Sequence, residues 1–128
     1  MDGAVLQHGK GCARRYPVTP VTKPRQTKSD KWKQRPCVLQ YRAFADEVRY
    51  RRLRVANGDH VTFVLPMPMS WSGKRRAEFV GKPHKQTPDV DNLAKALLDA
   101  LFGNDSHIWD IRLTKVWGVS GAIIVERI

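Results

Sequence analysis

Residues 88 to 102 read Pro88-Asp89-Val90-Asp91-Asn92-Leu93-Ala94-Lys95-Ala96-Leu97-Leu98-Asp99-Ala100-Leu101-Phe102. Apolar side chains recur along this stretch at helical spacing, which predicts a helix with one buried face. They are Leu93, Ala96, Leu97, Ala100 and Leu101. Asp91 suits the N-cap of this helix, and Gly103 suits the C′ position after it. The stretch therefore predicts an amphipathic helix that packs on the rest of the fold.

β-forming residues lie on both sides of this helix. Residues 61–65 read Val-Thr-Phe-Val-Leu and end at Pro66, which predicts a buried strand. Residues 111–117 and 122–125 predict two further strands. The connection between them, Gly118-Val119-Ser120-Gly121, is short and contains two glycines. We therefore expect these two strands to form a hairpin.

Earlier in the chain, Pro36 suits the first position of a second main helix. An apolar stripe continues from it, and we expect this helix to stop at Asn57-Gly58. The stripe consists of Val38, Tyr41, Phe44, Ala45, Val48 and Leu53. Residues 71–80 predict a short helix, with Ser72 as N-cap and Gly81 closing it.

The N-terminal part carries weaker signals. Residues 16–22 read Tyr-Pro-Val-Thr-Pro-Val-Thr, which suits an edge strand because proline cannot donate to a strand ladder. Residues 1–15 lack periodicity, and we expect them to be loosely ordered. The chain of 128 residues is then one domain, 1–128, of the α+β class. Its small mixed or antiparallel sheet is expected to pack with two main helices.

Charge narrows the class of partner. Lys and Arg number 23 against 12 Asp and Glu, a net charge of +11, which favours a polyanion such as nucleic acid. Two cysteines, Cys12 and Cys37, give neither a disulfide framework nor a zinc site, so we expect free thiols in a reducing cytosol. We expect no secretory signal and no membrane span.

Within this basic chain, Asp89 and Asp91 concentrate acid at one place. Two neighbouring carboxylates repel each other unless a cation lies between them. Their oxygens are hard ligands, and Mg²⁺ fits best because it uses one or two carboxylates and keeps waters. Lys95, one helical turn after Asp91, could stabilise charge on a phosphate. For Asp99 we weigh a salt bridge to Lys95 against a supporting role at the site.

Asp105, in the turn after the helix, is a third candidate ligand. The helix separates it from Asp91 by roughly 16 Å. Either a kink or return loop brings it back, or the Asp105 of a second copy reaches the site in a two-fold dimer. The four histidines show no ligand spacing, and serine or cysteine nucleophile motifs and phosphate-binding glycine loops are absent from the sequence. A plain alternative is a non-catalytic nucleic-acid binder whose aspartates are helix caps and ion-pair partners.

Four stretches occur in a distinctive order. They are Pro17-Val18-Thr19-Pro20-Val21-Thr22-Lys23-Pro24-Arg25; Lys31-Trp32-Lys33-Gln34-Arg35-Pro36; Leu65-Pro66-Met67-Pro68-Met69-Ser70-Trp71-Ser72; and Pro88-Asp89-Val90-Asp91-Asn92-Leu93 with Lys95, Leu98-Asp99-Ala100-Leu101 and Asn104-Asp105-Ser106-His107-Ile108. Together they resemble the RusA family of Holliday junction resolvases, in particular its short phage and prophage members. The resemblance covers most of the chain.

The resemblance implies a homodimer that cuts four-way DNA junctions with Mg²⁺, or Mn²⁺ in its place, in recombination and repair. The resemblance also implies that this enzyme needs no small-molecule cofactor. It implies that the enzyme acts in the cytoplasm of a bacterial or phage-infected cell, at the nucleoid. Asp89, Asp91 and Asp105 match the family's metal-binding aspartates, and Lys95 its essential lysine. Asn104 stands where the family commonly has a further acid, and Gln86-Thr87-Pro88 replaces its basic residues before the first aspartate.

Basic side chains in two segments are candidates for phosphate contact with the arms of a junction. They are Lys23, Arg25, Lys31, Lys33, Arg75, Arg76, Lys82 and Lys85. Trp32 and Trp71 are candidates either for the core or for a wedge at the branch point. A nuclease acting on flaps or other branched DNA would share the same chemistry and stays an alternative.

Overall fold

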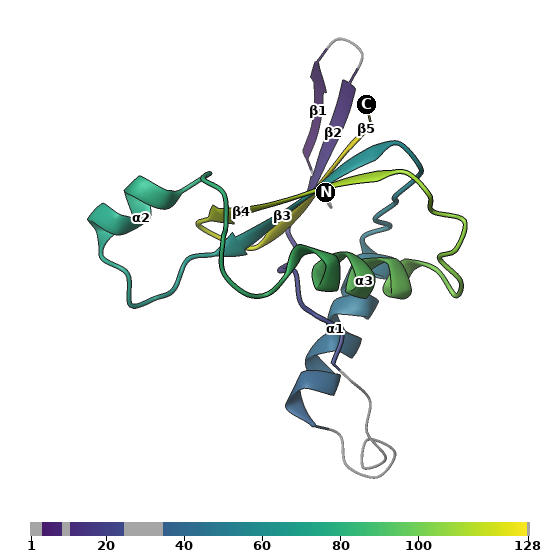
Figure 1. Ribbon diagram of the computed structural model, residues 1–128, viewed down its shortest axis with the longest axis horizontal. Coiled ribbons are helices and arrows are strands. Elements are labelled where there is room, and N and C mark those ends of the chain that lie inside the picture. The colour runs from purple at the N-terminus through teal and green to yellow at the C-terminus, as the bar shows by residue number, and fades with distance from the viewer. Residues whose placement is uncertain (1–3, 9–10, 25–34, 128) are drawn as a thin grey trace.

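The computed structural model describes residues 4–8, 11–24 and 35–127, which form five strands and three helices (Figure 1). In chain order these are β1 (Ala4–His8), β2 (Gly11–Tyr16), α1 (Pro36–Tyr50), β3 (Asp59–Pro66), α2 (Gly73–Phe79), α3 (Val90–Leu101), β4 (Ile111–Gly118) and β5 (Ala122–Arg127). Arg25, Lys31, Trp32 and Lys33, predicted to lie in a basic loop, fall outside the described residues.

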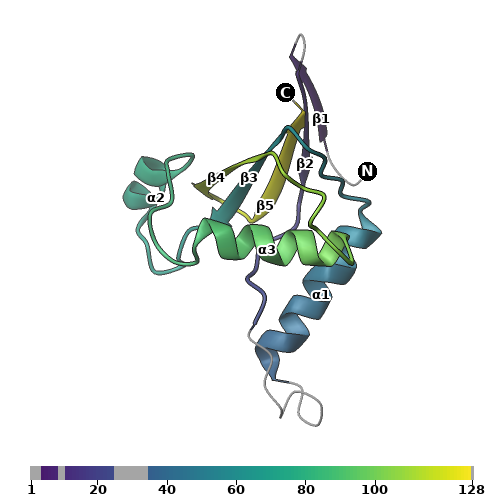
Figure 2. The same cartoon turned by 45° about the vertical axis from the view of Figure 1, so that its right-hand side comes forward.

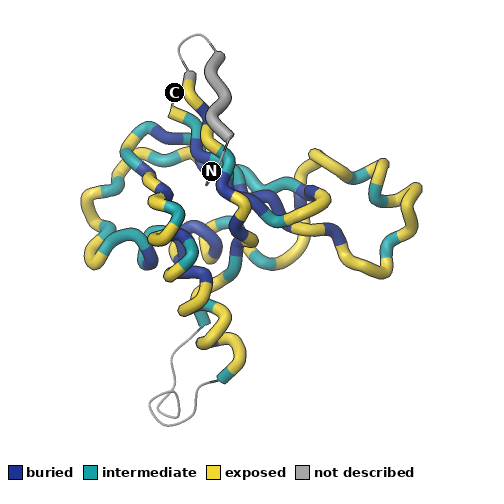
Figure 3. Tube along the Cα trace, turned by 180° about the vertical axis from the view of Figure 1, so that it is seen from behind, coloured by how far each residue is buried: buried dark blue, intermediate teal, exposed yellow. Residues whose placement is uncertain are grey.

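The strands form one mixed sheet in the order β1-β2-β5-β3-β4. β3 and β4 run parallel, whereas the other neighbouring pairs run antiparallel. Helices α1 and α3 pack together against one face of this sheet (Figure 2). Val48, Phe63, Leu93, Leu97 and Ile123 are fully buried where the layers meet, and buried segments gather there in Figure 3. The predicted α+β class, with two main helices on a small mixed sheet, is confirmed.

The predicted hairpin between the last two strands is wrong. β3 lies between β4 and β5, so the short connection crosses the end of β3. The two glycines of that connection have no room for a side chain. A Cβ at Gly118 would overlap Val64, and one at Gly121 would come within 2.6 Å of the Thr19 Cα. Close packing at this crossing therefore requires both glycines, which resembled turn residues in the sequence.

The N-terminal predictions are also wrong. β2 ends at Tyr16, and residues 17–24 have no regular secondary structure, because Pro17 and Pro20 cannot donate to a ladder. Residues 4–8 and 11–15, expected to be loosely ordered, form β1 and most of β2 instead. β2 pairs with β5 from Cys12 to Tyr16, so its order depends on a strand more than 100 residues later.

Helix α1 ends at Tyr50, earlier than the predicted stop at Asn57-Gly58. The amide of Leu53 donates to the Val48 carbonyl at 3.0 Å, and that of Arg52 donates to the Arg49 carbonyl at 3.0 Å. This is the Schellman pattern, with Arg52 at C′ in the left-handed region, φ 56°. Glycine usually occupies that position, so the sequence signal for this helix end was missing.

The short helix predicted within residues 71–80 is confirmed as α2. The Ser72 hydroxyl accepts a hydrogen bond from the Arg75 amide at 3.2 Å, and Gly81 has φ 78°. None of the seven residues of α2 is buried. In Figure 1 this helix projects away from α1 and α3. Within the described residues, no helix is both long and apolar enough to span a membrane.

Candidate active site

Asp89 and Asp91 lie at the N-terminal end of α3, and both are exposed. Asp89 is the N-cap residue and Asp91 lies in the first turn, so the prediction of Asp91 as N-cap is wrong. The helix begins at Val90, whose side chain packs against the core. The Asp89 carboxylate makes no capping hydrogen bond, and within the described residues neither aspartate forms an ion pair. Four carboxylate oxygens are therefore available to a ligand.

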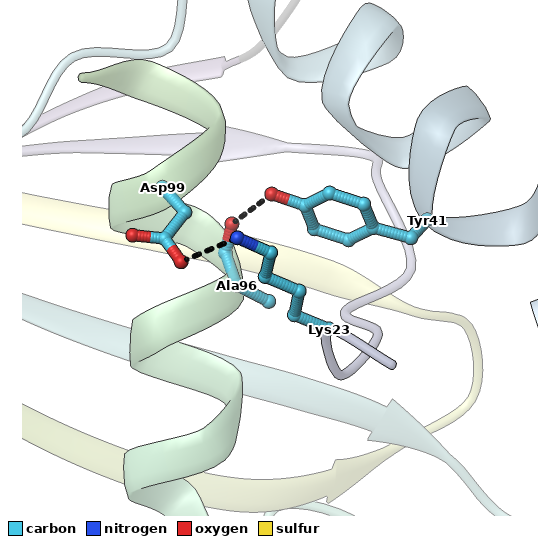
Figure 4. A network of polar contacts seen from close by, with 4 residues as sticks. All are labelled: Lys23, Tyr41, Ala96 and Asp99. Carbon is cyan, nitrogen blue, oxygen red and sulfur yellow. Dashed lines mark hydrogen bonds and ion pairs between the residues drawn. The ribbon is translucent and has the colours of Figure 1, made fainter. Parts of the chain in front are cut away.

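Lys95 is exposed on α3, one turn after Asp91, as the sequence predicted. The salt bridge from Lys95 to Asp99, one of the two roles weighed for Asp99, is not formed. Asp99 instead pairs with Lys23, whose Nζ lies 3.1 Å from Asp99 Oδ2 (Figure 4). The Lys95 ammonium therefore stays available to a phosphate group beside Asp91. Lys23 has an intramolecular partner, and its contact with DNA stays a prediction.

The Lys23–Asp99 ion pair lies beside a contact between helices α1 and α3. The Tyr41 hydroxyl on α1 donates to the Ala96 carbonyl on α3 at 3.4 Å, beside that pair (Figure 4). Burial raises the pKa of Tyr41, while the positive charge of Lys23 acts to lower it. The Lys23 ammonium also lies 5.9 Å from the centre of the Tyr41 ring. This corner therefore fixes α3 on α1 and has a structural role.

Asp105 lies in the turn between α3 and β4. That turn is held by the Ser106 amide, which donates to Asn104 Oδ1 at 2.9 Å, and by the Ile108 amide, which donates to the Asp105 carbonyl at 3.0 Å. Helix α3 has 12 residues, about 18 Å of rise, between Asp89 and this turn. Asp105 therefore follows the end of α3 opposite to Asp89, and whether it joins the site from the same chain or from a second copy stays a prediction.

Among the described residues, no three His, Cys, Asp or Glu side chains come together in a way that could hold a metal ion. The structure therefore brings Asp89, Asp91 and Lys95 together at one end of α3 and leaves Asp105 at the other. The two exposed carboxylates fit a hard cation such as Mg²⁺, which accepts one or two protein carboxylates and completes its shell with water and phosphate oxygens. This end of α3 therefore supplies two of the three predicted metal ligands.

Lys115 on β4 is a residue that the sequence did not single out. Its ammonium donates to the Gln86 carbonyl and, at 2.7 Å, to the Pro88 carbonyl. The amide of His84 donates to the Lys115 carbonyl at 2.9 Å. Lys115 therefore anchors the backbone that leads directly into Asp89. A lone lysine in a predicted strand carries no signal of this role, because the contact depends on how segment 84–88 folds against β4.

The basic residues near α2 that were predicted to contact DNA differ in how many protein contacts they already make. The Arg76 guanidinium donates to the Trp71 carbonyl at 3.2 Å and to the Pro68 carbonyl at 2.8 Å, so it closes the loop before the helix. The Arg75 guanidinium lies 4.2 Å from the Trp71 ring centre. Lys82 and Lys85 are exposed. Arg75 and the two lysines therefore remain open to phosphate.

Aromatic stacking holds Trp71 and His84 against Trp117 of β4. The rings of Trp71 and Trp117 lie 4.7 Å apart, and those of His84 and Trp117 lie 3.9 Å apart. Trp71 is half-buried, which favours the packing role over the wedge. Trp109, which sequence analysis did not single out, is 80% exposed and lies four residues after Asp105. Only its exposure marks it as a candidate for stacking on DNA bases.

Fold and site together define a small, basic α+β protein with an acidic centre at one end of a helix. The chain matches the family described as Endodeoxyribonuclease RusA over residues 17–127, nearly its whole length, and belongs to that family. The resemblance seen in the sequence is thereby confirmed, and membership implies an endodeoxyribonuclease that resolves Holliday junctions. No curated protein matches the chain.

Proposed function

We propose that the chain resolves four-way DNA junctions by Mg²⁺-dependent phosphodiester hydrolysis, with Mn²⁺ as a substitute, in DNA recombination and repair. The observation that supports this best is the exposed, unpaired pair Asp89 and Asp91 beside Lys95, in a chain of the RusA family. We propose that the protein acts in the cytoplasm of a bacterial or phage-infected cell, at the nucleoid.

We further propose that the working form is a two-fold dimer. Because Asp105 lies at the far end of α3, its carboxylate is available to Asp89 and Asp91 of another copy. Antiparallel placement of two α3 helices would supply each site with Asp105 from the other chain. The two symmetric strands of a four-way junction would then face two symmetric sites.

In this scheme Asp89 and Asp91 would hold the cation at the N-terminal end of α3. Bound Mg²⁺ supplies a water of lowered pKa and charge that stabilises the leaving oxygen. Lys95 holds positive charge one helical turn from Asp91, where a phosphate oxygen gains negative charge during hydrolysis. Lys115 keeps the backbone before Asp89 in place. Lys82, Lys85, Arg75 and the basic residues of segment 25–35 contact DNA phosphates without reading bases.

Nicking of a synthetic four-way junction, with and without Mg²⁺, tests the proposal. Asp91→Asn should abolish cleavage and keep junction binding intact or tighter, because negative charge near DNA is lost. Loss of both binding and cleavage would instead assign Asp91 a structural role. Binding by the unaltered chain with no nicking in any divalent metal would support the non-catalytic binder, and faster cutting of flaps than of junctions would change the substrate.

A further inference from the structure

A second charged hollow lies at the end of the sheet where β2, β3 and β5 meet, away from Asp89. It has a volume of about 210 Å³. Its lining comprises Cys12, Arg14, Tyr16, Arg54, Asp59, Val125 and Arg127. Cys12 pairs with Arg127 across β2 and β5, and Asp59 pairs with Arg127 across β3 and β5. Arg54 lines the same hollow from the segment between α1 and β3, so three arginines surround it.

A buried carboxylate orients one of these guanidinium groups. Asp59 is 1% exposed, and its Oδ2 accepts a hydrogen bond from the Ala56 amide at 2.8 Å. Its Oδ1 accepts from Arg127 Nε at 3.4 Å, whereas the Arg127 side chain is 68% exposed. Within the described residues, the two terminal nitrogens of Arg127 have no protein partner. A fixed Nε with open outer nitrogens is the geometry in which arginine binds a phosphate by two parallel hydrogen bonds.

The hollow carries an excess of positive charge that the protein leaves uncompensated. Arg14, Arg54 and Arg127 contribute three positive charges and Asp59 contributes one negative charge, which leaves a net charge of two. Within the described part of the chain, neither Arg14 nor Arg54 forms an ion pair. Three like charges around a concave surface repel one another unless an anion joins them.

We propose that this hollow, which we call the arginine pocket, binds a phosphate of the DNA backbone. The inference rests on the proposed function for the identity of the ligand. Arg54 and Arg127 also line a neighbouring hollow that reaches Leu101 and Phe102 at the C-terminal end of α3. The arginine pocket therefore lies towards the end of α3 that leads to Asp105. It adds to each chain a phosphate contact remote from its own Asp89 and Asp91.

Cys12 offers a direct probe of the arginine pocket, because its thiol is exposed and lines it. In a Cys37→Ser chain, Cys12 is the only thiol, and it can be modified by methanethiosulfonates carrying either a sulfonate or a trimethylammonium group. After correction for their rates with a free thiol, the anionic reagent should react faster on the order of tenfold, because two net positive charges lie nearby. Arg14→Ala with Arg54→Ala should bring the ratio close to one.

Competition identifies the ligand. Inorganic phosphate at tens of millimolar and a four-way junction in EDTA should each slow modification of Cys12 by the anionic reagent in the Cys37→Ser chain. Slowing by phosphate alone would show a site for free anions and overturn the assignment to DNA. An unchanged reagent ratio in the double arginine variant would overturn the pocket itself.

Junction binding in EDTA gives a second measurement. Arg14→Ala with Arg54→Ala should weaken binding about tenfold and reduce the slope of log affinity against log salt by about two. Arg127→Lys, which keeps a charge beside Asp59 but loses the planar fork, should weaken it less. Arg42→Ala, an exposed arginine on α1 outside the pocket, is the control. Equal slopes for the double variant and the unaltered chain would overturn the inference.

Neither measurement requires cleavage. Failure of the unaltered chain to nick a junction would therefore count against the proposed function alone. If the arginine substitutions change neither the reagent ratio at Cys12 nor the affinity for the junction, this would count against the arginine pocket alone.

Discussion

Single residues decide whether the acidic pair is correctly presented, and Lys115 is the clearest case. Its ammonium donates to the carbonyls of Gln86 and Pro88, so one side chain holds the Gln86–Thr87 and Pro88–Asp89 peptides. Asp89 follows directly and takes its backbone conformation from this support, φ −70° and ψ 147°. A supporting residue of this kind affects metal affinity by placing ligands, without touching the ion.

We predict that Lys115→Met raises the Mg²⁺ concentration for half-maximal junction cleavage about tenfold, because the two carbonyl contacts are lost. Lys115→Arg keeps a cationic donor and should restore most of the affinity. Mg²⁺ titrations of the cleavage rate measure this, with junction binding in EDTA as the control for folding. An unchanged Mg²⁺ dependence in Lys115→Met would remove Lys115 from the support of the site.

Lys23 illustrates a charge with two possible roles. It was predicted to contact DNA, yet it lies 3.1 Å from Asp99 with its side chain 38% exposed. Exposed ion pairs contribute roughly 0–1 kcal/mol, so Lys23→Met should lower the free energy of unfolding by less than about 1 kcal/mol. We predict that the salt slope of junction binding stays unchanged, because the charge is already neutralised by Asp99. A slope reduced by about one, measured as for the Arg14→Ala with Arg54→Ala variant, would return Lys23 to the DNA surface.

At the scale of elements, helix α1 ends without the glycine that usually follows a helix. Arg52 at φ 56° occupies the position that glycine fills at little cost. We predict that Arg52→Gly stabilises the fold by about 0.5–1 kcal/mol, because the left-handed strain at C′ is relieved. Arg42→Gly, in the interior of α1, should destabilise by about 1 kcal/mol. Thermal unfolding of both variants measures the difference, and equal destabilisation would contradict the Schellman assignment.

The segment between β3 and α3 should respond to pH through His84. Burial lowers the pKa of His84, and the charge of Lys115 lowers it further. Because the unfolded chain takes up a proton near pH 6.5 and the folded chain does so only at lower pH, this part of the stability is complete above pH 6.5. It is lost as the pH falls towards the folded pKa.

We therefore predict that the melting temperature falls more steeply between pH 6.5 and 5 in the unaltered chain than in His84→Phe. Phenylalanine keeps an aromatic ring against Trp117 but cannot take up a proton. The difference between the two melting curves isolates His84 from the other titrating groups. Parallel curves over this range would mean that His84 does not couple protonation to folding.

Elements with strong local patterns were predictable, and those set by distant partners were not. The spacing of Leu93, Leu97 and Ala100 predicted α3, and the β-formers before Pro66 predicted β3. β2 was missed because β5 orders it, and the supposed hairpin failed because β3 separates its strands. For the site, the sequence identified the acidic residues and Lys95. It could not identify Lys115, whose role exists only once segment 84–88 lies against β4.

At the scale of the whole molecule, α3 separates the predicted ligands, and this makes the number of chains per site an experimental question. Asp89 and Asp91 lie at one end of α3 and Asp105 beyond the other, with no metal-binding group of three among the described residues. We therefore predict that a site using all three is shared between two chains. Subunit mixing can test this without a structure of the complex.

Asp91→Asn and Asp105→Asn chains should each be inactive alone if both carboxylates are needed. In a mixed dimer with shared sites, one site receives both altered residues and the other receives an intact Asp91 from one chain with an intact Asp105 from its partner. Equal mixing and random reassociation should therefore restore about one quarter of the active sites. Single-strand nicking of a labelled junction measures the recovery.

If each site used residues of one chain, every chain in the mixture would still lack one carboxylate, and no nicking would return. The matched control mixes Asp89→Asn with Asp91→Asn chains, because both changes affect the same half of the site and no arrangement of two such chains is intact. Recovery in the first mixture and none in the second would require Asp105 to act across a dimer. Recovery in neither, with subunit exchange shown by a tag on one chain, would exclude the shared site.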